Sequence, residues 1–223
     1  MGINISKFRG EIKVRCSLDK CLPYVLILSV LLTGCASTQK LSEQDKKRIE
    51  VVKLNTKVER PKDMYYFGPG ASVGLLFGAV GGAIAGVSNM GPGSAMLAFA
   101  EQNGVRIEEI VSQEFEGALR QSGKLKIADR AGDNGATINL SVIQFGFSVP
   151  NGFSSRLVPV VSFKSEMVDA GGNVIWSARD SVLPLGNPVE GEPADALRTN
   201  AKAIEAAWRA AVKHIACNMV SEL

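Results

Sequence analysis

Residues 161–178 read VSFKSEMVDAGGNVIWSA, and this stretch decides the fold class. Before its turn, apolar Val161, Phe163 and Met167 alternate with polar neighbours, which is the period-two pattern of a strand with one buried face. Segment 169–173 contains two adjacent glycines and is typical of a turn, and the alternation resumes beyond it. The pattern predicts an antiparallel β-hairpin.

Two more strands are expected before this hairpin. A short one is predicted around residues 125–127, where apolar and charged side chains alternate. In a longer one, the apolar side chains keep one phase over residues 138–142 and the opposite phase over residues 143–149. Because one extra residue reverses the phase of a strand, this switch predicts a β-bulge.

Two apolar stripes with helical spacing flank these strands. The first, with Gly123 placed to cap its end, runs over Ile107, Ile110, Val111, Phe115, Ala118 and Leu119. The second starts near Pro193 and runs over Leu197, Ala201, Ile204, Trp208, Ala211, Ile215 and Met219. An earlier helix is expected to be capped by Ser94 and interrupted at Asn103-Gly104.

These elements predict an α+β fold. It is a two-layer sandwich in which a mostly antiparallel sheet of four to five strands packs on two helices. The fifth strand is an early one within residues 51–58, and the domain itself is assigned to residues 94–223. Two helical segments are expected outside it, a Gly-rich apolar segment and an N-terminal signal helix.

The amino terminus has the composition of an export signal. Residues 22–34 carry no charge, and five basic residues precede them. An apolar run of 13 residues fits a signal peptide and is too short to span a bilayer as a helix. The run ends in Leu32, Thr33 and Gly34, which Cys35 follows.

This ending resembles the lipobox of bacterial lipoproteins, an aliphatic residue and two small residues before a cysteine. The resemblance implies that residues 1–34 are removed by the lipoprotein signal peptidase, which recognises Leu32, Thr33 and Gly34. It also implies that Cys35 carries a covalent lipid, and no other cofactor is expected. Ala36 implies sorting to the outer membrane, with the domain facing the periplasm. Residues 35–60 are then assigned to the lipid anchor and a polar tether.

Removal of the signal changes the charge balance. Five of the 25 Lys and Arg and two of the 22 Asp and Glu lie within residues 1–35, which leaves 20 of each. A chain without net charge gives no reason to expect nucleic acid as a partner. Cys16 and Cys21 are removed with the signal, so no intramolecular disulfide pair is left. Cys217 is expected to pack in the core, with a reactive thiol as the alternative.

Residues 61–93 form an apolar zone with five glycines at a strict period of four. They are Gly70, Gly74, Gly78, Gly82 and Gly86. On a helix these glycines share one face, which lets another helix approach closely, although each costs about 1 kcal/mol relative to alanine. Two interpretations stay open: packing within a membrane or oligomer, and packing on the protein's own domain.

Two local motifs resemble parts of known envelope domains. Segments 121–125 and 167–176 are similar to a helix end and a hairpin in three groups of proteins. These are the amino-terminal domain of the Tol-Pal translocation protein, the curli secretion lipoprotein and the lipoprotein activators of penicillin-binding proteins. The likeness covers about residues 107–223 and implies the two-layer fold. The glycine zone resembles instead the glycine-zipper lipoproteins related to the rickettsial surface antigen, although only one full zipper is present.

Little in the sequence points to catalysis. His214 is the only histidine and is expected at the surface, so a two-histidine metal site is impossible. The acidic pairs Glu108–Glu109 and Glu114–Glu116 are interpreted as a solvated helix face. We therefore expect no enzyme activity, no catalytic residues and no bound metal.

Three functional classes follow. The favoured one is an outer-membrane lipoprotein with a non-catalytic structural, assembly or partner-docking role, which docks through sheet edges or the loop 150–156. Its partner would be an envelope protein or another copy that meets the glycine segment. The alternative is a membrane-inserting oligomeric component of an export or pore assembly. The least favoured is a periplasmic hydrolase, for which two carboxylates would suffice.

Overall fold

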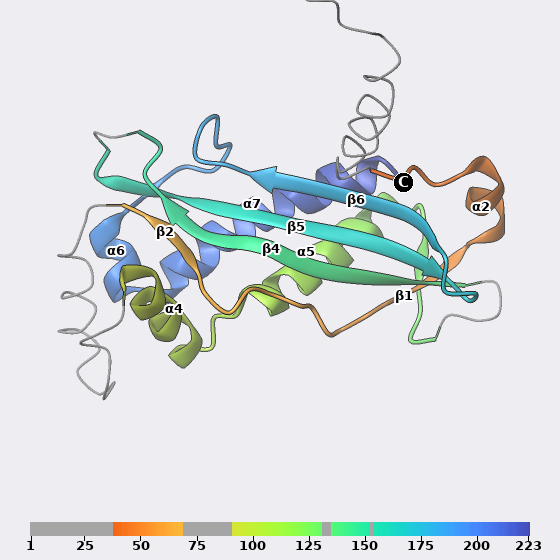
Figure 1. Cartoon of the computed structure of the whole chain (residues 1–223), viewed down its shortest axis with the longest axis horizontal. Coiled ribbons are helices and arrows are strands. Elements are labelled where there is room, and N and C mark those ends of the chain that lie inside the picture. Colours follow the sequence, from red (N-terminus) through yellow and green to blue (C-terminus); the bar gives the residue numbers. More distant parts are fainter. Residues whose placement is uncertain (1–37, 69–90, 131–134, 152–153) are drawn as a thin grey trace, which may run out of the picture. The chain divides into compact units, whose positions relative to one another are not determined.

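The structure is a computed structural model that describes residues 38–68, 91–130, 135–151 and 154–223 (Figure 1). All of these belong to one compact unit, Ser37–Leu223. The expected signal helix and the Gly-rich segment between Gly70 and Gly86 lie outside the described residues. Within the described ranges, no helix is long and apolar enough to cross a bilayer.

Within the described ranges the sheet has seven strands, and its two long ladders are antiparallel. The strands are β1 (Val51–Leu54), β2 (Tyr65–Phe67), β3 (Lys126–Ile127), β4 (Ala136–Ser148), β5 (Arg156–Asp169), β6 (Val174–Val182) and β7 (Glu192–Pro193). Their order is β3-β1-β4-β5-β6, while β2 pairs with β4 and β7 pairs with β5. The α/β class and the mostly antiparallel sheet are confirmed. The expected count of four to five strands is too low, because β2 and β7 are too short to show a period in the sequence.

The predicted hairpin is the β5–β6 pair. Met167 lies opposite Trp176 in the register, and the turn closes with hydrogen bonds between Asp169 and Asn173 and from Gly172 to Asp169. The predicted bulge is also confirmed, because the β4–β5 register shifts between Val142 and Gln144. The extra residue, Ile143, is 37% exposed. Residues on both sides of it can therefore turn apolar side chains toward the same core.

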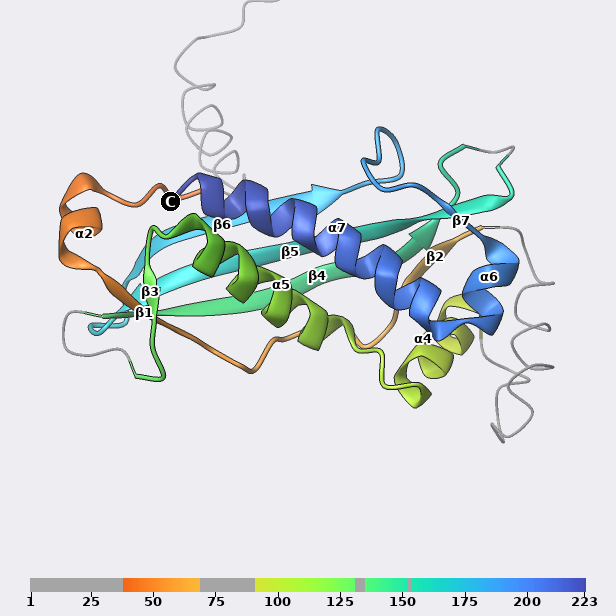
Figure 2. The same ribbon diagram turned by 180° about the vertical axis from the view of Figure 1, so that it is seen from behind.

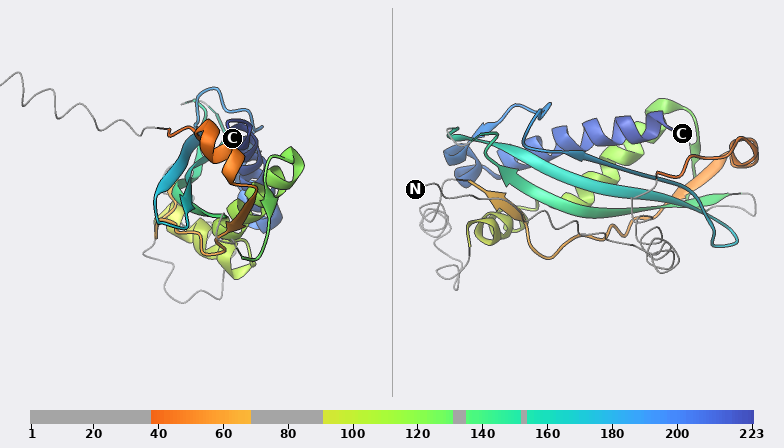
Figure 3. Two further views of the ribbon diagram at one scale, coloured as in Figure 1. Left: turned by 90° about the vertical axis from the view of Figure 1, so that its right-hand side faces the viewer. Right: turned by 45° about the horizontal axis from the view of Figure 1, so that its top comes forward.

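The described helices are α2 (Glu43–Arg48), α4 (Pro92–Gln102), α5 (Ile107–Ser122), α6 (Ala194–Thr199) and α7 (Ala201–Ser221). Helices α5 and α7 pack against each other and contact the sheet through β4, β5 and β6. Figure 2 shows both helices across one face of the sheet, and the left view of Figure 3 shows them on one side of the cyan strands. This arrangement is a sheet layer covered by a helix layer.

Helix ends agree with the sequence in part. Gly123 caps α5 in the left-handed conformation at φ 64°, as predicted. Ser94 is not the cap of α4, because Pro92 starts that helix after Gly91. The expected single C-terminal helix is two helices, since Asn200 adopts an extended conformation and caps α7 by accepting a hydrogen bond from the Lys202 amide.

The core lies between the sheet and the helix pair. Trp208 on α7 is fully buried, with ring centroids 5.6 Å from Phe145 and 5.8 Å from Phe147 on β4. Phe115 on α5 packs edge-on against Phe163 on β5 at 6.3 Å. Aromatic side chains bury more apolar area than any others, so these contacts supply much of the force that holds the two layers together.

Residues 38–60, assigned from the sequence to a polar tether, are part of the folded unit. Leu41, Ile49 and Val52 are buried in the core, and β1 lies inside the sheet between β3 and β4. The folded unit therefore begins well before Ser94. The sequence conceals this because single apolar residues among charged ones show no local period, and only their distant partners give them a place.

Candidate functional site

The residues predicted to be functional lie outside the described part of the chain. They are Leu32, Thr33, Gly34 and Cys35 of the lipobox and Gly70, Gly74, Gly78, Gly82 and Gly86 of the glycine segment. The structure does show where the chain that follows the predicted lipobox joins the fold. This entry point, residues 38–50, is the first candidate region.

At the entry point, Gln39 adds to the edge of the sheet. Its backbone exchanges two hydrogen bonds with Ser177 on β6, at 2.8 and 2.9 Å. The side-chain Nε2 of Gln39 donates to the carbonyl of Val174 at 2.9 Å. The exposed edge of β6 is thus occupied at Ser177 by the chain that arrives from the amino terminus.

Charged groups join the entry point to the β5–β6 turn. Ser42 caps α2, and its hydroxyl donates to Asp45 at 2.6 Å. Arg48 lies 2.7 Å from the Asp45 carboxylate and 3.7 Å from that of Asp169 in the turn. One arginine therefore links the short helix to the hairpin.

These contacts change the protonation of both carboxyl groups. The hydrogen bond from Ser42 and then that from Arg48 lower the pKa of Asp45 below its usual 3.8. The pKa of Asp169 is lowered mainly by the backbone N–H of Asn173, with Arg48 as a smaller contributor. Hydrogen bonds that favour the charged form of a carboxylate have this effect.

A second candidate is a shallow groove of about 520 Å³ between α7 and the loop that precedes β7. It is lined by Pro188, Val189, Glu190, Ala210, Lys213, His214 and Cys217. His214 is exposed, as predicted, and its Nε2 lies 3.3 Å from Asn218, which donates to Asp180 at 3.1 Å.

The expectation that Cys217 packs in the core is wrong, because this thiol is exposed. Ile215 and Met219 on either side of it face the core, and a residue midway between them points to solvent at 100° per residue. The groove thus holds an accessible thiol and a histidine on one helix.

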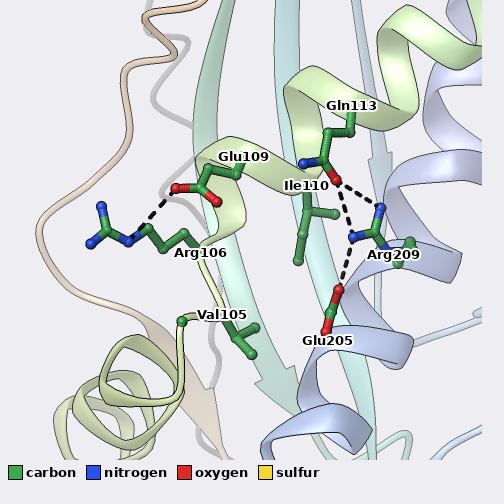
Figure 4. Close-up of a pocket in the computed structure, with 8 residues that line it drawn as sticks. Val105, Arg106, Glu109, Ile110, Gln113, Glu205 and Arg209 are labelled. Atoms are coloured by element: carbon green, nitrogen blue, oxygen red, sulfur yellow. Dashed lines mark hydrogen bonds and ion pairs between the residues drawn. The ribbon is translucent and has the colours of Figure 1, made fainter.

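A third candidate is a small cleft of about 80 Å³ between α5 and α7 (Figure 4). Arg209 lines one side of it and contacts Glu114 at 2.7 Å, Glu205 at 2.8 Å and Gln113 at 3.2 Å. The hydrogen bonds to Glu205 and Glu114 raise the pKa of Arg209. The guanidinium of Arg209 is thus already bonded to protein groups. It joins α7 to α5 and is therefore not free to bind a ligand in this cleft.

The acidic pairs on α5 are also engaged. Glu108 pairs with Arg60 at 3.1 Å, and Glu116 pairs with Arg120 at 2.6 Å. Arg60 also lies 5.7 Å over the ring of Phe145 and so ties the segment between β1 and β2 to the core. The described residues contain no group of three or more His, Cys, Asp or Glu that could hold a metal ion.

No protein-family model matches the chain, and no curated protein matches it. Among solved structures, it is similar to a DUF330 family protein from Xanthomonas campestris, with a TM-score of 0.41, 14% identity, and coverage of 77% of this chain and 81% of that one. It is also similar to two PelC dodecamers from Paraburkholderia phytofirmans, with TM-scores of 0.34 and 0.36 and identities of 13% and 12%. Each of these two comparisons covers 84% of this chain and 92% of PelC.

Proposed function

We propose that this protein is an outer-membrane lipoprotein, anchored through Cys35, whose periplasmic α/β domain has a non-catalytic docking or assembly role. The observation that carries the proposal is where folding starts. The compact unit begins at Ser37, and Gln39 already pairs with the sheet. A compact unit that begins within a few residues of Cys35 supports the proposal, because a lipoprotein is cut at the cysteine of its lipobox.

The surface supports docking more than chemistry. Tyr65 is 37% exposed and Phe67 is 62% exposed, and alternation along β2 places both on the same side of that strand. Paired exposed aromatic side chains are typical of protein-binding surfaces. An envelope protein that packs on Tyr65 and Phe67 is therefore the proposed partner. The likeness to the Tol-Pal, curli and activator domains stays a proposal.

The flanks of residues 69–90 bear on the pore alternative. A side-chain carbon added at Gly68 would lie 2.6 Å from the Tyr66 hydroxyl, and one added at Gly93 would lie 3.1 Å from the Tyr66 Cβ. Gly68, just before the segment 69–90, and Gly93, just after it, therefore both lie against the side chain of Tyr66. One passage through a bilayer would separate them by roughly 30 Å, so the flanks favour the docking role over a single membrane crossing.

The first test is the chemistry of the mature amino terminus. The full chain is expressed in a Gram-negative host, extracted in detergent, and its N-terminal peptide is identified by mass spectrometry. We expect a peptide that starts at Cys35 and carries acyl groups. In Cys35→Ser, residues 1–34 should be retained. A mature chain that starts elsewhere, or that carries no lipid, would refute the proposal.

The second test separates docking from membrane insertion. Residues 1–35 are replaced by an ordinary cleavable secretion signal, and cell fractions are washed with alkaline carbonate. Release of the chain as soluble periplasmic protein would leave the lipid as the sole anchor, as proposed. Retention in the membrane pellet would support the pore or export alternative.

A further inference from the structure

The loop between β6 and β7 presents two leucines to solvent. Leu183 is 53% exposed, and Leu185, with 83%, is the most exposed large apolar side chain in the described part of the protein. Single exposed leucines are ordinary on protein surfaces. Two of them within three residues, with Pro184 between them, form an apolar tip that has no cover.

The protein holds this tip in place. The side chain of Asn187 donates to the Pro159 carbonyl on β5 at 2.7 Å and accepts from the Val189 amide at 2.9 Å. Arg156 on β5 donates to the Gly191 carbonyl at 2.7 Å. The base of the loop is therefore fixed to β5 at two points. The leucines project from a supported loop.

Chain length limits how far the lipid can lie from the edge of β6. Four peptide units separate Cys35 from Gln39, and an extended chain covers at most about 3.6 Å per residue, so Gln39 is within roughly 14 Å of Cys35. Gln39 is bonded to Ser177 on β6. With a lipid on Cys35, the part of the β6 edge around Ser177 lies close to the bilayer surface.

The loop leaves the same edge. From Ser177, six residues of strand lead to Leu183, which is about 20 Å along β6. Figures 1 and 2 show the loop after β6 projecting beyond that edge of the sheet. Two exposed basic residues lie nearby, Lys40 on the entry segment and Lys213 in the groove beside the loop, whereas the exposed Glu190 in that groove pairs with Arg156 at 3.3 Å.

We propose that Leu183 and Leu185 are a second membrane contact, inserted into the interfacial layer of the bilayer that holds the lipid of Cys35. The proposal rests on the lipidation proposed above. Apolar side chains of this kind enter the boundary between headgroups and acyl chains, about 5–10 Å deep. The lipid confines the loop near the surface, which raises the effective concentration of this second contact. The two contacts together fix the orientation of the domain.

The test uses a fluorescent reporter in the full lipidated chain. Leu185→Cys is made in a Cys217→Ser background, so that position 185 carries the sole free thiol of the mature protein, and it is labelled with an environment-sensitive dye. The protein is reconstituted in vesicles of phosphatidylethanolamine and phosphatidylglycerol. Asp129→Cys, an exposed site beyond β3 at the opposite end of the strand order, is the matched control.

We expect the emission at position 185 to shift to the blue and to be quenched by lipids with spin-labelled acyl chains, while position 129 stays water-like. The N-terminal mass of the same sample is measured. A lipidated sample in which position 185 stays water-like overturns the membrane contact and leaves the lipoprotein proposal intact. A sample without lipid on Cys35 overturns both.

Discussion

Gln39 and Ser177 exchange a pair of backbone hydrogen bonds, with N···O distances of 2.8 Å and 2.9 Å. This pairing extends the sheet by one residue beyond β6 and attaches the chain that comes from the amino terminus. Residues 38–50 have the polar composition of a tether, but this pairing makes them part of the folded unit. The stability of this attachment can be tested directly.

Gln39→Pro should release the entry segment without unfolding the domain. Proline has no amide hydrogen, so the bond from Gln39 to the Ser177 carbonyl is lost. Hydrogen exchange should become faster at Ser177, whose amide donates to Gln39. Gln39→Ala, which keeps the backbone pairing, is the control and should retain protection. Equal protection in both variants would show that the pairing is not what holds the segment.

Gly146→Ala should destabilise the protein by about 1–3 kcal/mol. Gly146 has φ 147°, and an added Cβ would lie 1.8 Å from the Tyr65 carbonyl oxygen, so β2 would have to separate from β4. Urea denaturation measures the change. Gly117→Ala is the matched control. Gly117 is exposed in the interior of α5 with nothing within 4 Å of its added Cβ, and this change should stabilise by about 0.5–1 kcal/mol. Equal effects at the two sites would contradict the close approach.

Trp208→Ala should cost about 3–5 kcal/mol, because it empties a fully buried site between the sheet and the helix layer. It also removes the hydrogen bond from Nε1 to the Gly146 carbonyl, whose length is 3.4 Å. Chemical denaturation of the purified domain gives the value. Lys213→Ala on the solvent side of the same helix should change stability by less than about 0.5 kcal/mol. A similarly small loss at Trp208 would mean that the two layers do not depend on this ring.

Acid should weaken the link between α2 and the β5–β6 turn. The pKa values of Asp45 and Asp169 are lower in the folded protein than their usual 3.8. The folded state therefore binds fewer protons, so the stabilisation is complete above the unfolded pKa and is lost as the pH falls through the folded one. Thermal melts of the wild type and of the Asp45→Asn, Asp169→Asn double variant should differ at pH 7. The difference should begin to shrink below about pH 4 and vanish only when the pH has fallen below the lowered pKa values of the folded protein, and a difference that does not change with pH would contradict this assignment.

The sequence predicted what depends on local periodicity. Three features follow from a few neighbouring residues: the β5–β6 hairpin, the bulge after Val142 and the Gly123 cap. The first two follow from the spacing of apolar side chains, and the third follows from the freedom of glycine to adopt the left-handed conformation. The α/β class follows in turn from the order of these elements. The predicted lipobox is also a local pattern, and it stays a prediction.

The tertiary structure alone decided the rest. Only packing shows that residues 38–60 belong to the domain, because the pairing of Gln39 with Ser177 joins positions far apart in the chain. Cys217 was placed in the core because its helix is apolar on several sides, and only the direction of the sheet decides which side is buried. Leu185 is exposed on a loop whose base Asn187 joins to β5, a contact between residues far apart in the chain. Local sequence patterns determine the helices and strands of this protein. Contacts between residues far apart in the chain decide which faces of these elements are buried and which surface is left for a membrane or a partner. No short stretch of sequence reveals the partners in those contacts.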